Sequence, residues 1–143
     1  MSAENQQLIE KAKSQVAKAY APYSEFRVGA AALLENGEIF AGSNQENSAY
    51  PSGLCAERVA MFYANSQYPE VPVKTLAIAA FTNGNFLPEP ITPCGSCRQV
   101  LLESESRFNT DITIMLYGTE SVYVLQNVKQ LLPLWFENSS LNR

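Results

Sequence analysis

Three cysteines are the feature that most restricts how this 143-residue chain can fold. Cys55 and Cys94 each stand at the start of a predicted helix, and Cys97 follows Cys94 by about one helical turn. A helix N-terminus carries partial positive charge, which favours the thiolate form that binds metals. The chain has no histidine, so a metal would have to be held by Cys, Asp or Glu. The pattern predicts two halves of one Zn²⁺ site, with three thiolate ligands and the fourth tetrahedral position open for water.

The composition is that of an acidic chain with the size of one domain. With 46% hydrophobic residues, residues 1–143 are enough to form a single domain around one core. The net charge is -4, the sequence pI is about 4.8, and no basic stripe is present, which argues against nucleic acid or an anionic membrane as the main partner. We expect no signal peptide, because the first residues are polar, and no membrane span, because no apolar run is long enough. We therefore expect a cytoplasmic protein whose thiols stay reduced.

Hydrophobic periodicity and turn residues predict helices and strands in alternation. Helices are predicted at Asn5–Tyr20, Cys55–Gln67, Cys94–Ser104 and, as a short element, Val128–Leu132. Strands are predicted at Val28–Leu34, Ile39–Gly42, Thr75–Thr82, Asp111–Tyr117 and Val122–Gln126. An Asn36-Gly37 turn joins the first two strands, and Asn83–Pro93 is expected to be a proline-rich loop. This order predicts an α/β fold in which helices cover one mixed sheet.

Each half of the cysteine pattern has a simpler explanation when it is taken alone. A Cys-x-x-Cys pair is often a redox pair or half of a structural zinc site, and a single cysteine such as Cys55 is usually buried and inert. Here no thioredoxin-like pattern surrounds the pair, and no fourth Cys or His completes a structural site. Taken together, Cys-x-Glu followed by Pro-Cys-x-x-Cys is the all-cysteine form of the zinc deaminase signature. In that signature Glu57 would be a general acid and base and not a metal ligand.

Short motifs along nearly the whole chain resemble those of the small cytidine deaminase family, whose members form homotetramers. The matching segments are Ala21–Phe26, Val28–Ala31, Gly42–Asn47, Tyr50-Pro51, Cys55–Arg58, Pro93–Gln99, and Leu131–Pro133 with Phe136. The resemblance implies a three-layer α/β/α fold with a mixed five-stranded sheet and one Zn²⁺ per subunit. It also implies hydrolytic deamination of cytidine and deoxycytidine to the uridine products, with release of ammonia.

The resemblance assigns the metal and proton chemistry to five residues. Cys55, Cys94 and Cys97 would bind the zinc, together with one water. Glu57 would take a proton from that water, pass it to the ring nitrogen next to C4, and later help the amine to leave. Arg58 would hydrogen-bond the thiolates and withdraw negative charge from them, which restores the acidity of the metal.

The same resemblance assigns the substrate contacts. Asn44 and Glu46 would hold the ribose, although without the family they would be expected to be solvated loop residues. Phe26 would pack against the pyrimidine ring. Without the family resemblance, Phe26 would be expected in the hydrophobic core. Tyr50 and Phe136 are also placed at the site. Because relatives supply such residues from neighbouring subunits, the resemblance implies a homotetramer with shared active sites, and the sequence leaves open which subunit supplies these two residues.

Three other functions share part of this pattern. A sibling deaminase would act on another cytosine nucleoside, such as a blasticidin-type antibiotic, but the Asn44-Gln45-Glu46 loop and Tyr50-Pro51 favour ordinary cytidine. A polynucleotide deaminase needs a basic and aromatic surface, which this acidic chain lacks. A zinc-binding module without turnover is the alternative outside enzymes, and ammonia release from cytidine separates it from an enzyme.

Overall fold

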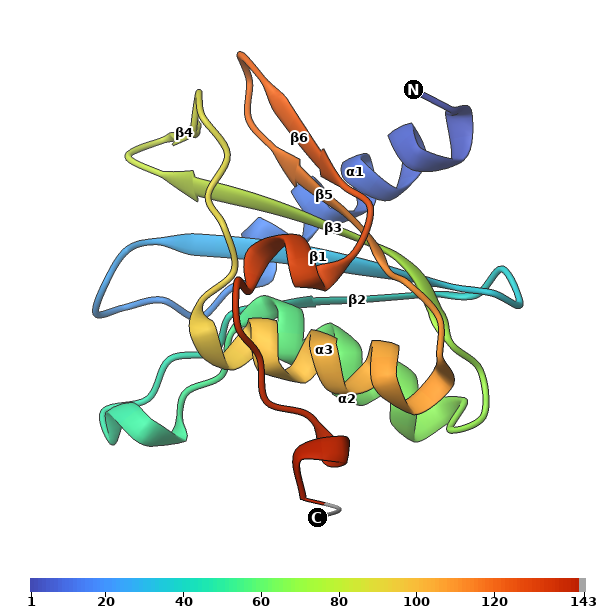
Figure 1. Cartoon of the computed structure of the whole chain (residues 1–143). Helices are drawn as coiled ribbons and strands as arrows, with labels where there is room; N and C mark the ends of the chain where they lie inside the picture. The colour runs from blue at the N-terminus through green and yellow to red at the C-terminus, as the bar shows by residue number, and fades with distance from the viewer. Residues whose placement is uncertain (142–143) are drawn as a thin grey trace.

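The computed structural model describes residues 1–141, and Figure 1 shows the arrangement of its elements. The helices are α1 (Ala3–Gln15), α2 (Ala56–Gln67) and α3 (Gly95–Phe108), with short 3₁₀ helices η1 (Val16–Lys18), η2 (Tyr50–Ser52), η3 (Val128–Leu131) and η4 (Asn138–Ser140). The strands are β1 (Arg27–Leu34), β2 (Ile39–Ser43), β3 (Val73–Thr82), β4 (Asn85–Phe86), β5 (Thr113–Tyr117) and β6 (Val122–Leu125). None of the described helices is long and apolar enough to cross a membrane.

One mixed sheet forms the centre of the molecule. Its main path runs β2-β1-β3-β5-β6, and β4 pairs with the end of β3. β1 is antiparallel to both of its neighbours, β3 and β5 are parallel, and β5 and β6 are antiparallel. A parallel pair needs a crossover connection, and the chain between β3 and β5 supplies it with α3. The crossover therefore brings the helix that begins after Cys94 onto one face of the sheet.

Helices cover both faces of the sheet, which gives the layers seen in Figure 1. Successive side chains of a strand point to opposite faces. Accordingly, Ala31 and Leu33 of β1 belong to the core under α1. Ala30 and Ala32 belong to the core under α2 and α3. Burial on both faces explains why β1 is a continuous apolar run without polar alternation.

Two glycines, one in β1 and one in β2, let helices pack directly against these strands. A Cβ on Gly29 of β1 would lie 2.0 Å from the carbonyl oxygen of Ala12 in α1. A Cβ on Gly42 of β2 would lie 2.7 Å from Cγ1 of Val59 in α2. Because α2 packs this closely on β2, its first residues are held at the edge of the sheet where β2 ends.

The predicted three-layer α/β/α arrangement and the mixed sheet are confirmed, with one addition. The five predicted strands are present, and the sixth, β4, forms inside the segment predicted to be a loop. Asn83 and Gly84 have positive φ angles of 53° and 80°, and this turn folds the chain back onto β3. The first helix ends earlier than predicted, because the chain tightens into η1 after Gln15. The helix after Cys94 runs further than predicted and ends where Asn109 adopts a left-handed conformation.

Candidate active site

The three cysteines meet because the starts of α2 and α3 lie together. Cys55 and Cys94 are the N-cap residues of these helices, and Cys97 lies in the first turn of α3. The sulfur of Cys94 lies 3.8 Å from that of Cys55 and 3.6 Å from that of Cys97, and all three sulfurs lie within 4.8 Å of one another. Tetrahedral zinc with bonds of ~2.3 Å to sulfur spaces its ligands ~3.8 Å apart. The thiol cluster therefore fits one zinc ion, and the predicted joining of the two cysteine segments is confirmed.

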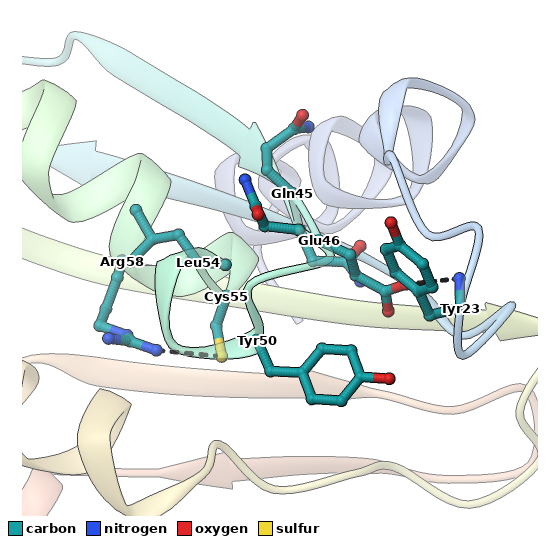
Figure 2. A pocket seen from close by; sticks show the side chains of 10 residues that line it. Tyr23, Gln45, Glu46, Tyr50, Leu54, Cys55 and Arg58 are labelled. Carbon is teal, nitrogen blue, oxygen red and sulfur yellow. Dashed lines mark hydrogen bonds between the residues drawn. The ribbon is translucent and has the colours of Figure 1, made fainter.

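Arg58 lies one helical turn after Cys55 and brings a positive charge to the cluster. Its guanidinium donates a hydrogen bond to the Cys55 sulfur over 3.5 Å, as Figure 2 shows. Hydrogen bonds from the Cys97 thiol and from Arg58 lower the pKa of Cys55 to about 5. Both contacts therefore favour the thiolate of Cys55, which is the form that binds metal.

Glu57 is in the first turn of α2, and only 4% of its surface is exposed. This burial raises the pKa of its carboxyl above the usual range, and the negative charge of Cys55 adds to the effect. A carboxyl that titrates closer to neutral pH can both accept and donate a proton. The side chain has the properties of a proton carrier beside the thiol cluster.

A cavity of about 300 Å³ opens beside the cysteines. It is lined by Ser24, Phe26, Val28, Asn44, Glu46, Cys55, Ala56, Glu57, Ile91, Thr92 and Cys94. Sites for small molecules are typically clefts of ~300–1,000 Å³ with apolar walls and a few polar groups. Of the residues described, those that line this cavity include no Lys or Arg, so it suits an uncharged ligand better than a phosphate.

Asn44 follows β2 and joins the wall of the cavity to the start of β1. Its Oδ1 accepts a hydrogen bond from the Val28 backbone N–H, and its Nδ2 donates to the Phe26 carbonyl, both over 2.8 Å. Phe26 is partly buried against the core under α2 and α3. The amide of Asn44 thus fixes the backbone on both sides of Arg27, including that of Phe26.

Glu46 fixes the loop that precedes β1 by hydrogen bonds, as Asn44 does for the start of that strand. Its carboxylate accepts hydrogen bonds from the backbone N–H groups of Tyr23 and Ser24 and from the Ser24 hydroxyl. The bond from the Ser24 hydroxyl is the main cause that lowers the pKa of Glu46. Glu46 is therefore ionised at neutral pH, and it orders one side of the cavity entrance.

Tyr50 lies outside the lining of this cavity. Its side chain is 78% exposed, and it lines an adjacent pocket of about 360 Å³ together with Tyr23, Cys55 and Arg58 (Figure 2). The Tyr50 and Tyr23 rings meet edge to face with their centroids 6.1 Å apart. Cys55 lines both spaces, so the two are neighbours across this cysteine.

Phe136 also lies outside both spaces within its own chain. Its residue is 54% exposed, and its carbonyl accepts a hydrogen bond of 2.8 Å from Nε2 of Gln99 on α3. The backbone at Phe136 is therefore attached to α3, while the residue remains more than half exposed. One chain brings Phe26, Asn44 and Glu46 to the cavity, but not Tyr50 or Phe136.

The sequence reasoning missed Ser24, Ile91 and Thr92 as lining residues. The sequence could have indicated Thr92, because this residue directly precedes Pro93 and lies two positions before Cys94. A residue before proline is held in an extended conformation. The segment that leads to the metal-binding Cys94 was therefore predictable as an extended chain beside the site.

Similarity to known proteins extends over almost the whole chain. Residues 2–110 match the family model described as the cytidine and deoxycytidylate deaminase zinc-binding region. The cytidine deaminase of Sporosarcina psychrophila is 40% identical over 137 residues, which cover 96% of this chain and 94% of that protein. The cytidine deaminase of Halalkalibacterium halodurans is 36% identical over 139 residues, which cover 97% and 98%. The crystal structure of cytidine deaminase from Burkholderia pseudomallei matches with a TM-score of 0.79 and 38% identity, over 95% of this chain and 100% of that one.

Proposed function

The chain belongs to the cytidine and deoxycytidylate deaminase family, and on that premise we propose that it hydrolyses cytidine and deoxycytidine to uridine and deoxyuridine with release of ammonia. The observation that carries the proposal is the position of Glu57. A buried carboxyl lines the same cavity as Cys55 and Cys94, and that cavity suits an uncharged ligand. Metal ligands, a proton carrier and a space for the substrate therefore occur together.

Cys55, Cys94 and Cys97 would hold one Zn²⁺ in this proposal. When bound, the zinc would supply Lewis acidity that lowers the pKa of water from ~15.7 to ~7. Three thiolates donate much negative charge and would weaken that effect. The hydrogen bond from Arg58 to Cys55 draws part of this charge from the sulfur.

Glu57 carries the protons in each step. Its carboxylate accepts a proton from the attacking water and delivers it to the ring nitrogen next to C4, which makes C4 electrophilic. The water oxygen adds to C4, and the carbon becomes tetrahedral. Glu57 then takes the proton of the new hydroxyl group and gives it to the amino group. The bond from C4 to the amino nitrogen breaks, ammonia leaves, and C4 becomes a carbonyl carbon.

Phe26, Asn44 and Glu46 bind the substrate. Phe26 offers an aromatic face to the pyrimidine ring. Glu46 receives three hydrogen bonds from the loop before β1. A carboxylate has about four acceptor positions, so one is left for a ribose hydroxyl. The lack of a lining cation supports a nucleoside as the substrate in preference to a nucleotide.

Residues 1–143 form a single domain that assembles as a homotetramer with shared active sites in this proposal. Tyr50 and Phe136 are 78% and 54% exposed and do not line the cavity of their own chain, which supports a neighbouring subunit as their destination. On α2, Phe62 and Tyr63 add exposed aromatic surface that a subunit contact would cover. A cytoplasmic location suits the three metal-binding thiols, because they must stay reduced.

The proposal is tested by incubating the purified protein with cytidine and measuring absorbance loss, ammonia release and bound zinc. We expect ammonia in step with the loss of cytidine. If cytidine and deoxycytidine are both inert while another cytosine nucleoside reacts, the substrate assignment is wrong.

A cytidine analogue with a tetrahedral, hydroxyl-bearing C4 should bind ~10²–10⁸-fold more tightly than cytidine, because enzymes are complementary to the transition state. Equal inhibition by uridine and this analogue would contradict attack of water at C4.

A further inference from the structure

The segment before Cys94 is held in place by side chains and not by backbone hydrogen bonds to the sheet. Pro88, Pro90 and Pro93 have no N–H group to donate to a neighbouring strand. Within the described part of the chain, no hydrogen bond between backbone groups involves residues 89–93. This segment nevertheless forms a wall of the substrate cavity through Ile91 and Thr92. The position of that wall therefore depends on side-chain contacts.

Glu89 accepts hydrogen bonds from the Ser121 and Tyr123 hydroxyls, and Ile91 packs against the core. Arg98, in the first turn of α3, supplies the contacts next to Cys94. Its Nε donates to the Pro93 carbonyl over 2.8 Å, and one terminal nitrogen donates to the Thr92 hydroxyl over 2.9 Å. The other terminal nitrogen donates to the Leu131 carbonyl over 2.6 Å. Each of the three nitrogens thus has its own acceptor. A guanidinium offers this fixed fork of donors, whereas the single ammonium group of lysine does not.

Leu131 is the last residue of η3, so the guanidinium also connects the cavity wall to the C-terminal segment. Further along α3, Gln99 donates to the Phe136 carbonyl, and Ser106 donates to the Glu137 carboxylate over 2.7 Å. The C-terminal segment crosses α3 in Figure 1, where it is drawn in red. The helix that carries Cys97 therefore holds both the cavity wall and the path of the C-terminal segment.

We propose that Arg98 is a positioning residue for the deamination. It acts through Thr92 and Pro93, which set the position of Cys94 and of the cavity wall, and through Leu131, which sets the path of the C-terminal segment. The kinetic part of this inference rests on the proposed function. The position of the Cys94 sulfur does not, because it is a property of the metal-bound protein with or without turnover.

The matched variants are Arg98→Lys and Arg107→Lys. Arg107 is the control because it lies on the same helix and also donates to a distant carbonyl, that of Pro69, but near the end of α3 away from the cysteines. The absorption spectrum of the cobalt(II)-loaded proteins reports the geometry of the thiolate ligands. Steady-state kinetics with cytidine report KM and kcat separately.

Arg98→Lys should shift the cobalt spectrum and raise KM by at least about tenfold, because misplacement of a site by ~1 Å can cost ~10²-fold. KM should change more than kcat, since the displaced wall contacts the substrate before as well as during the reaction. Arg107→Lys should keep the wild-type spectrum and KM. If Arg98→Lys is folded and also keeps both, or if the two variants change alike, the positioning role is overturned.

Thr92→Val removes one of the three hydrogen-bond acceptors of Arg98 without altering α3. This variant therefore tests the positioning role if Arg98→Lys does not fold. It should raise KM in the same direction by a smaller factor, and a wild-type KM and cobalt spectrum would again overturn the proposal. If the wild-type protein turns over no cytidine, the proposed function fails. The cobalt spectra of the same proteins then still decide whether Arg98 positions Cys94.

Discussion

The guanidinium of Arg58 donates a hydrogen bond to the sulfur of Cys55 over 3.5 Å, across the first turn of α2. Cys55 lies just before this helix, where the aligned backbone dipoles also favour a negative charge. The two effects act together on one sulfur of a cluster that can hold three thiolates. Arg58 therefore balances the charge of the metal site from within the helix that begins at the site.

Replacement of Arg58 by Gln should weaken zinc binding. Residues that hydrogen-bond a metal ligand typically contribute ~10–100-fold to metal affinity or activity. Competition with a chromophoric chelator measures the zinc affinity directly. Arg107→Gln on α3 is the control, since it removes an arginine that hydrogen-bonds the Pro69 carbonyl and lies over the Phe108 ring, near the end of α3 away from the cysteines. Equal affinities of the two variants would show that the Arg58 contact does not support the metal.

Replacement of Glu57 by Gln should leave zinc bound and abolish turnover. General acid and base groups typically contribute ~10²–10⁴-fold, and the upper end is expected because Glu57 serves several proton transfers. Metal analysis and the cytidine assay are carried out on the same sample. Glu103→Gln, an exposed position on α3, should keep both zinc and activity. A zinc-loaded Glu57→Gln protein with near-normal turnover would assign the proton transfers to another group.

Replacement of Cys97 by Ala should remove the metal and destabilise the fold. Cys97 is fully buried in the first turn of α3, so its sulfur is both a ligand and part of the packing there. Metal binding contributes directly to folding when ligands from separate segments are joined. A chelator should lower the melting temperature of the wild-type protein and have no effect on the variant. A variant that retains stoichiometric zinc would contradict a three-cysteine site.

Glu105 should make stability depend on pH at a position remote from the metal. Its buried carboxylate accepts hydrogen bonds from the backbone N–H groups of Ile112 and Val128, over 2.7 and 3.0 Å. Burial nevertheless raises its pKa above the ordinary value of 4.5. Between these two pKa values the folded state binds more protons than the unfolded state. The free energy of unfolding therefore falls as pH rises through this window.

Urea unfolding of the wild type and of Glu105→Gln, at several pH values from the acid range to neutrality, measures this contribution. The amide oxygen of Gln can still accept both bonds, so the variant should gain stability relative to the wild type as pH rises. If it loses relative stability instead, the two N–H donors outweigh burial and the pKa is lowered. Glu105→Ala should be destabilising at every pH, because each buried N–H left without a partner costs about 1–3 kcal/mol.

Mixed assemblies test the shared active site. A Glu57→Gln subunit cannot move protons but still provides Phe136, whereas a Phe136→Ala subunit has the opposite defect. Hybrids formed by unfolding and refolding the two together should regain activity, since some sites then draw every part from an intact source. Size measurement should show a tetramer. A monomer at assay concentration, or hybrids with only the summed activity of the two variants, would contradict sharing.

The sequence by itself determined the metal cluster and the layers of the fold, because both depend on local rules. Cys94 and Cys97 are one helical turn apart wherever that helix lies, and Cys55 precedes a second helix. The apolar run of β1 likewise required burial on both faces of a sheet. These features follow from the periods of helix and strand, and those periods can be read without knowledge of distant contacts.

Only the tertiary structure decided which groups hold the cluster and the cavity in place. Arg98 meets Leu131, and Glu105 meets Val128, across separations that no local pattern encodes. Asn44 and Glu46 were expected only as ribose ligands, yet their amide and carboxylate also bind the segment before β1. The physical reason is that a buried backbone group must find a hydrogen-bond partner, and which side chain supplies it depends on the packing of the whole chain.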